Sequence, residues 1–405
     1  MFKIRDCQLR AGSLAGEHMP LLVSAETGLP DLHATAYSVL NDRDAGKSPS
    51  TIERRLRGIG VGLAFLQQRG IDLVERLASG TFLANHELSG LAANCRNRAD
   101  GGGQVVGEYS TNRYADFIAY IVHRSAIYRV RARGEQRLML LKALEDFEKR
   151  AAAAKPQAKT STRTKEREGL TLDQRRLFLE VIHPDHPKNP FREKLRNRNF
   201  ALLLTSFRIG PRAGELLGLK REDYDDVGHS DDGSEARSLT IHRRPDDPDD
   251  KRRRQARQKT LARTIILHDP EVIRALGVTL KERKDRKLFP RAYRQPFLFV
   301  NEDGDALAYD GLVKIFHQIR RKFPELAALC NHMLRHDWND RWEEMKAEKG
   351  WEGEQARMDQ CYAQGWSPTS VQPDIYPKKA IRKRSSQRIA DMAKKNIGLP
   401  RAAND

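Results

Sequence analysis

The sequence is poor in cysteine and has no long apolar run. Its four cysteines are spread along 405 residues: Cys7, Cys95, Cys330 and Cys361. They form no Cys-x-x-Cys pair and have no histidine at metal-finger spacing, which disfavours a zinc finger and favours reduced thiols. No segment approaches the roughly 18 apolar residues of a membrane span, and the opening residues lack the apolar core of a signal peptide. These absences predict a soluble, cytoplasmic protein.

Aromatic residues are scarce and acidic residues are outnumbered. Aromatics make up 7% of the chain, and 73 lysines and arginines against 55 acidic residues give a formal net charge of +18. Such a charge favours a polyanionic partner and binding that weakens as salt rises. Nucleic acid, here expected at the prokaryotic nucleoid, is therefore the leading partner, and the chain is long enough for two domains.

The first half of the chain carries apolar stripes with helical spacing. One follows the N-cap candidate Ser48, a second follows Ser110, and a third contains Leu138, Leu140, Leu141, Leu144 and Phe147. They predict an all-α domain at 31–150, preceded by an arm or ribbon at 1–30. Residues 151–169 are rich in lysine, arginine and threonine, which is typical of a solvated basic linker.

The second half mixes helical and strand-like segments. Residues 171–182 and 194–206 have helical patterns, whereas 238–242 and 261–267 are β-branched and 296–300 is an apolar run that could join them. The remainder is mainly helical, with breaks near Gly350 and Gly365. We predict a mainly α domain with a small antiparallel β-sheet (α+β) at 170–385, followed by a tail at 386–405.

The segment from Ile209 to Lys220 contains the most informative motif. Arg212 follows Gly-Pro at an expected turn-to-helix junction, where free amides and a guanidinium together favour a phosphate. Glu215 lies one turn along and can hold the guanidinium. The alternative for Arg212 alone is an exposed ion pair. Arg208 competes for the role but lacks the Arg-x-x-Glu-Leu spacing.

A second motif lies about 120 residues further on. His332 and Arg335 are three residues apart and share a helix face, which offers a proton-transfer group and a second phosphate clamp. A capped or paired surface helix is the alternative. Trp366 follows in Gly-Trp-Ser, where a core or interface ring competes with an indole that donates to a phosphate.

Tyr376 lies beyond these motifs in Pro-Asp-Ile-Tyr-Pro, beside a basic segment. A phenol has a pKa of about 10, so a tyrosine nucleophile needs cations and an acceptor close by. Tyr362 is the rival, although its neighbours Met358 and Cys361 suggest a buried helical face.

Taken in order, Arg212, His332-x-x-Arg335, Trp366 and Tyr376 resemble the active-site boxes of the tyrosine site-specific recombinases, the phage-integrase family. The resemblance covers about 170–385. It implies that Tyr376 forms a 3′-phosphotyrosyl bond with DNA while both arginines stabilise the phosphate and His332 assists proton transfer. The retained bond energy serves religation, so this scheme requires no cofactor and no metal.

The same resemblance implies a general-acid lysine ahead of a strand, for which Lys259 is the candidate. The neighbouring basic residues leave that assignment open: Lys251, Arg252, Arg253, Arg254 and Arg257. The resemblance further implies that 31–150 is a core-binding domain that clamps double-stranded DNA. It also implies a homo-tetramer on two DNA sites, with the C-terminal tail packed against a neighbour.

We therefore expect a site-specific recombinase acting in integration, excision or transposition of a mobile element. Two alternatives remain: a type IB-like topoisomerase acting as a monomer, and a non-catalytic DNA-binding regulator with the same fold, which would not need Tyr376. A metal-dependent nuclease is disfavoured because the acidic residues at 246–250 lie among prolines in an expected loop.

Overall fold

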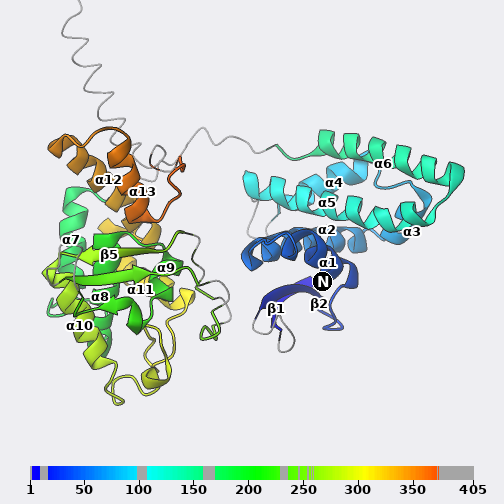
Figure 1. The fold of residues 1–405 in the computed structure, drawn as a ribbon. Helices are drawn as coiled ribbons and strands as arrows, with labels where there is room; N and C mark the ends of the chain where they lie inside the picture. Colours follow the sequence, from blue (N-terminus) through cyan, green and yellow to red (C-terminus); the bar gives the residue numbers. More distant parts are fainter. Residues whose placement is uncertain are drawn as a thin grey trace, which may run out of the picture. The chain divides into compact units, whose positions relative to one another are not determined.

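The computed structural model describes residues 2–9, 17–97, 107–157, 169–228, 236–244, 247–252, 255–256, 258, 260–371 and 373. The chain divides into two compact units, Met1–Thr164 and Lys165–Asp405. Both are mainly helical with small antiparallel sheets (Figure 1), which confirms the predicted fold class. No helix among these residues is long and apolar enough to cross a membrane.

The first unit opens with a β-hairpin. Strand β1 (Phe2–Gln8) pairs antiparallel with β2 (His18–Ser24), and both contact helix α2 (Pro49–Gln68). Strand β2 places Met19 and Leu22 in the core of this unit. The expected arm is thus a ribbon whose apolar face is buried against the helices.

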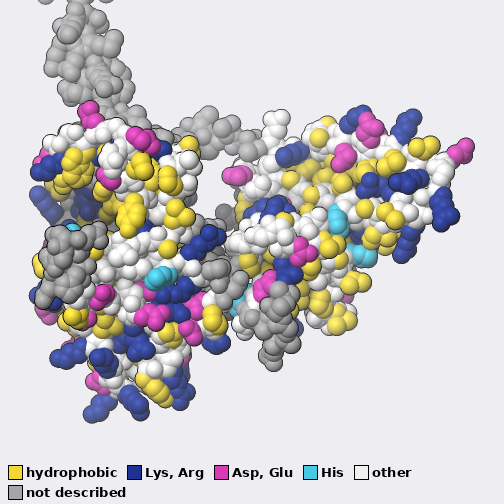
Figure 2. Space-filling model, in the orientation of Figure 1, with side chains coloured by type: hydrophobic (Ala, Val, Ile, Leu, Met, Phe, Trp, Pro, Cys, Tyr) yellow, Lys and Arg dark blue, Asp and Glu magenta, His cyan; other side chains and the backbone are white. Residues whose placement is uncertain are grey.

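The first unit contains six α-helices among the described residues, and α5 begins at Glu108, slightly before the stripe expected after Ser110. They are α1 (Leu32–Ser38), α2, α3 (Leu73–Ser79), α4 (Asn85–Cys95), α5 (Glu108–Arg131) and α6 (Gly134–Ala154), with a π-helical turn at Val39–Arg43. Ser48 caps α2, with a proline at its first turn. In Figure 2, basic side chains on the visible face of each unit are interspersed with acidic and apolar ones.

Helix α6 differs from the predicted stripe. Leu140 and Leu144 are buried, but Leu138 and Leu141 are 68% and 42% exposed. The buried face follows helical spacing and continues through Phe147 to Ala151, so the helix extends to Ala154, beyond the expected linker boundary.

The second unit is built around α8 (Glu193–Ile209), whose second half is almost entirely buried. Helices α10 (Pro270–Glu282) and α12 (Asn331–Lys349) contact it. The other helices are α7 (Leu172–Ile182), α9 (Ala213–Gly218), α11 (Tyr309–Lys322) and α13 (Gly353–Gln364), with short 3-10 turns at Arg221–Asp223, Ala292–Arg294 and Pro324–Leu326. Left-handed glycines end α12 at Gly350 and α13 at Gly365, where breaks were predicted.

A small antiparallel sheet lies in the second unit, in the order β3 (Tyr224–Asp225), β4 (Arg237–Ile241), β5 (Arg263–Leu267). Its register pairs Leu239 with Ile265. The apolar segment 296–300, which could have joined this sheet, makes only isolated bridges, including Phe297 with Lys220. Phe297 to Val300 are buried at every position, which explains an apolar run without strand alternation.

Candidate active site

The first motif forms a sharp junction between two helices. Helix α8 ends at Gly210, whose φ of +68° is left-handed, and Arg212 is the N-cap of α9. The Arg212 backbone N–H donates to Glu215 Oε2 at 3.0 Å, and its Nη1 lies 3.5 Å from Glu215 Oε1. The Arg212 side chain is 32% exposed, whereas that of Glu215 is fully buried. The guanidinium therefore remains accessible while its carboxylate neighbour lies beneath it.

Two residues that the sequence did not indicate hold Glu215. Arg263, at the start of β5, donates from Nη2 to Glu215 Oε2 at 2.9 Å, and the Thr260 hydroxyl donates to Oε1. Burial alone would raise the pKa of Glu215, but the charges of Arg263 and Arg335 and these hydrogen bonds hold the pKa below its ordinary value. Glu215 is thus an ionised carboxylate that organises several groups, not only Arg212.

Arg335 connects the two motifs. It is buried in α12 and donates from Nη1 to Gly210 O at 2.8 Å and from Nη2 to Gln364 O at 3.0 Å. Asn331, one turn earlier, donates to Pro211 O at 2.9 Å. The carbonyls of both residues before Arg212 are therefore held by α12, more than 100 positions along the chain.

His332 lies at the solvent-facing start of α12. It is exposed, whereas Arg335, three residues along the same helix, is buried. His332 Nε2 lies 3.1 Å from His336 Nε2, with the rings edge to face.

Trp366 is a packed ring. It is buried, its indole Nε1 included, and the Arg335 guanidinium lies 5.3 Å from its ring centroid. The preceding Gly365 carbonyl accepts from Leu261 N at 3.0 Å, which joins the end of α13 to the segment that enters β5. The burial of this ring favours the alternative in which Trp366 is a core residue over the one in which its indole donates to a phosphate.

Lys259 and Tyr376 lie outside the described residues. Both neighbours of Lys259 make ordered contacts: Thr260 with Glu215, and Gln258 through Oε1 with the Arg244 backbone N–H at 3.0 Å. The competitor Arg252 is buried, pairs with Asp250 and donates to Leu217 O and Leu307 O, which makes it a structural residue.

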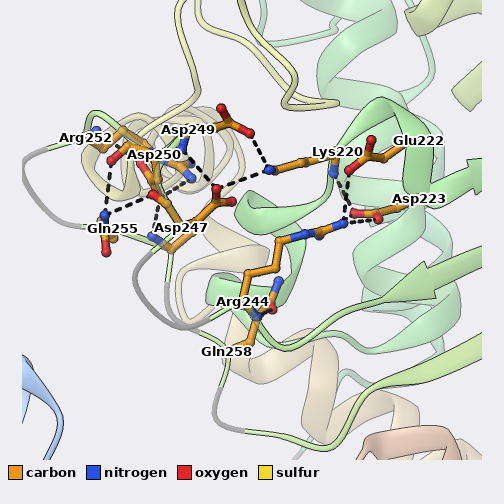
Figure 3. A network of polar contacts seen from close by, with 11 residues as sticks. Lys220, Glu222, Asp223, Arg244, Asp247, Asp249, Asp250, Arg252, Gln255 and Gln258 are labelled. Atoms are coloured by element: carbon orange, nitrogen blue, oxygen red, sulfur yellow. Dashed lines mark hydrogen bonds and ion pairs between the residues drawn. The ribbon is translucent and has the colours of Figure 1, made fainter. Parts of the chain in front are cut away.

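Basic and acidic residues around this loop neutralise each other in the network of Figure 3. Lys220 Nζ lies 3.1 Å from Asp247 and 2.6 Å from Asp249, and Arg244 pairs with Asp223. Burial would lower the pKa of Lys220, but these two aspartates raise it. Asp247, Asp249 and Asp250 are therefore engaged by basic side chains. Across the part of the chain that the structure describes, no three His, Cys, Asp or Glu residues converge as a metal site.

The expected buried face at Tyr362 is wrong. Tyr362 is 59% exposed and Met358 is also exposed, because α13 turns Cys361, Gln360 and Gln364 inward. The Tyr362 hydroxyl donates to Thr264 O at 3.1 Å. Arg208, the rival of Arg212, forms an ion pair with Asp269 at 2.8 Å.

Replacing Gly365 by alanine is expected to destabilise the second unit more than replacing Gly350. Both glycines end helices with positive φ, so both substitutions carry the same backbone strain. A Cβ at Gly365 would lie 2.3 Å from Arg263 Nη1, and that guanidinium is fixed by Glu215 and Ala363 O, whereas Gly350 has open space. We expect Gly365→Ala to lower the free energy of unfolding by about 1–3 kcal/mol more than Gly350→Ala does.

Tryptophan fluorescence during urea unfolding measures this difference. All four tryptophans, at 338, 342, 351 and 366, belong to the second unit, so the signal reports on that unit alone. Equal losses for the two substitutions would show that the guanidinium below Gly365 is free to move.

Comparison with known proteins found no matching family model and no matching curated protein. Among solved structures, the chain is similar to the XerH site-specific recombinase bound to difH substrate in a pre-cleavage complex, with a TM-score of 0.37 and 16% identity. It is also similar to XerH bound to palindromic difH in a post-cleavage complex, with a TM-score of 0.39 and 18% identity. Each match covers 75% of this chain and 84% of the other. At these scores the likeness does not assign the chain to a family.

Proposed function

We propose that this protein is a tyrosine-type site-specific recombinase that cleaves and rejoins DNA through a 3′-phosphotyrosyl intermediate. One observation carries the proposal: Asn331 and Arg335 bind the carbonyls of Pro211 and Gly210, directly before Arg212. The arginine motif and the His-x-x-Arg motif thereby form one polar site. A chance pair of surface motifs would have no reason to share these contacts.

In this proposal the partly exposed Arg212 guanidinium binds the scissile phosphate at the start of α9. Arg335 adds positive charge from below and fixes the turn, and both cations stabilise the charge that develops on the non-bridging oxygens. Glu215 stays ionised beneath them and serves as counterion to the buried Arg263 guanidinium, which offsets part of the desolvation cost of that charge. Trp366 packs against Arg335 and limits its movement.

The chemical step forms one bond and breaks one. The Tyr376 oxygen attacks phosphorus, the bond from phosphorus to the 5′ oxygen breaks, and His332 assists transfer of the phenol proton. Lys259 protonates the leaving 5′ oxygen. The Thr260–Glu215 contact beside Lys259 supports that assignment over Arg252, whose guanidinium is buried. The bond energy is kept in the phosphotyrosyl ester for religation.

The partner in this scheme is double-stranded DNA, in keeping with a net charge of +18. Residues 31–150 would clamp the duplex, 151–169 would cross the backbone, 170–385 would carry catalysis, and the tail at 386–405 would pack against a neighbour in a tetramer. The task would be integration, excision or transposition of a mobile element.

A covalent-adduct assay tests the proposal. Full-length protein is incubated with nicked and with supercoiled DNA carrying candidate recombination sites, and the products are separated on a denaturing gel. A protein band that carries DNA and is lost on protease treatment is the expected result. DNA binding without any adduct on a cognate site would favour the regulator, and relaxation by a monomer without site preference would favour the topoisomerase.

Arg212→Ala is expected to lower the rate of adduct formation about 10²–10³-fold, the usual cost of one transition-state donor. Stability should change little, because the side chain is partly exposed and its contact to Glu215 is long, at 3.5 Å. Arg208→Ala is the matched control, since its partner is Asp269. Single-turnover adduct formation measures both variants, and an equal loss for Arg208→Ala would overturn the assignment of Arg212.

A further inference from the structure

Two histidines face each other across one turn of α12. His332 and His336 are four residues apart, and their Nε2 atoms are separated by 3.1 Å with an angle of 80° between the rings. His332 is exposed and His336 is half-buried, so solvent reaches this pair. At this distance one ring nitrogen donates its hydrogen to the other.

The distance between the two Nε2 atoms also matches that between two nitrogen ligands of one metal ion. Zinc–imidazole bonds of 2.0–2.1 Å at a tetrahedral angle place two nitrogens about 3.3 Å apart, close to the observed separation. We propose that His332 and His336 form a two-histidine binding site for a borderline transition-metal ion of the Zn²⁺ or Cu²⁺ class. The ion takes the place of the shared hydrogen, which moves to Nδ1 so that both rings ligate as neutral imidazoles.

The acidic residues on α12 do not complete a larger cage. Asp337 accepts from Leu170 N, Arg175 and Arg341, and Asp340 accepts from Gly169 N at 2.9 Å. These carboxylates are committed to holding the start of the second unit. Neither carboxylate is therefore available as a third ligand.

The consequence for activity rests on the proposed function. A metal ion on His332 removes the nitrogen that would assist proton transfer, so the ion acts as a reversible inhibitor of DNA cleavage. A chelator restores the activity. The metal is not a catalytic group in this proposal, because it occupies the acid–base residue.

Metal binding to the full-length protein tests the site without DNA. We expect calorimetric titration to give a higher affinity for Cu²⁺ than for Zn²⁺ and none for Mg²⁺, because imidazole binds the first two and Mg²⁺ prefers oxygen ligands. His332→Asn and His336→Asn should each weaken Zn²⁺ binding at least about tenfold, because each leaves a single ligand. His317→Asn is the control, since His317 is also exposed but lies on a different helix, α11. Zn²⁺ affinity that is unchanged in both α12 variants overturns the proposal.

Spectroscopy of the unaltered protein gives an independent readout. Cu²⁺ bound by this pair should show two nitrogen ligands by electron paramagnetic resonance, and one nitrogen or none overturns the site. Adduct formation is then measured with and without Zn²⁺. If the ion binds but no adduct forms under any condition, the recombinase proposal fails and the metal site stands. If adducts form and Zn²⁺ does not bind, only the metal site fails.

Discussion

Tyr376→Phe is expected to abolish the covalent DNA adduct while DNA binding and unfolding of the second unit stay as in the wild type. Phenylalanine lacks the oxygen that bonds to phosphorus, and none of the cations at the site can replace it. Loss of an enzyme nucleophile removes most of the catalysed rate, so adduct formation should fall at least about 10³-fold. A filter-binding assay on the same DNA measures retained binding, and the denaturing gel measures the adduct.

Tyr362→Phe is the matched control. The Tyr362 hydroxyl is exposed but donates to Thr264 O in β5, so its loss should remove one surface hydrogen bond and leave the adduct intact. If the adduct persists in Tyr376→Phe and disappears in Tyr362→Phe, the nucleophile is Tyr362. Peptide mapping of the adduct identifies the attached tyrosine directly. An adduct that survives both substitutions contradicts both assignments.

Local signals explain the parts of the fold that the sequence predicted well. Ser48 and Thr171 cap helices where a hydroxyl precedes an apolar stripe, and Gly350 and Gly365 end helices at left-handed positions. The Arg212 junction was likewise foreseeable, because Gly-Pro followed by a helical pattern fixes a turn. Each of these features is decided by residues within one or two turns of the helix concerned.

The contacts that assemble the site have no such local signal. Arg263 and Thr260 reach Glu215 from more than 40 positions away, and the basic run before them gives no reason to choose Arg263 over its neighbours. Arg335 was expected as a phosphate clamp on the helix face of His332, yet tertiary packing buries it against backbone carbonyls. The isolated bridges at 296–300 and the exposure of Tyr362 have the same origin, since burial at both places is set by elements distant in sequence.

Glu215→Gln is expected to be the most destabilising of the conservative substitutions at the site. The carboxylate is fully buried with Arg263, whose side chain is only 1% exposed. A neutral amide keeps the shape but leaves the Arg263 guanidinium as a buried charge without its counterion, which costs about 3–5 kcal/mol. Urea unfolding followed by tryptophan fluorescence measures the loss in the second unit. Glu354→Gln is the control, because Glu354 pairs with Arg357 at the surface and its replacement should leave the midpoint unchanged.

The pH dependence separates loss of the charge from loss of packing. The folded pKa of Glu215 lies below its ordinary value of 4.5. The stabilisation that its ionised form provides is therefore fully present above pH 4.5 and is lost as pH falls through the folded pKa. The difference in free energy of unfolding between the wild type and Glu215→Gln should thus shrink progressively as the solution is acidified below pH 4.5. A stability difference that stays constant down to the acid limit would mean that shape, and not the ionised carboxylate beneath Arg212, holds this site together.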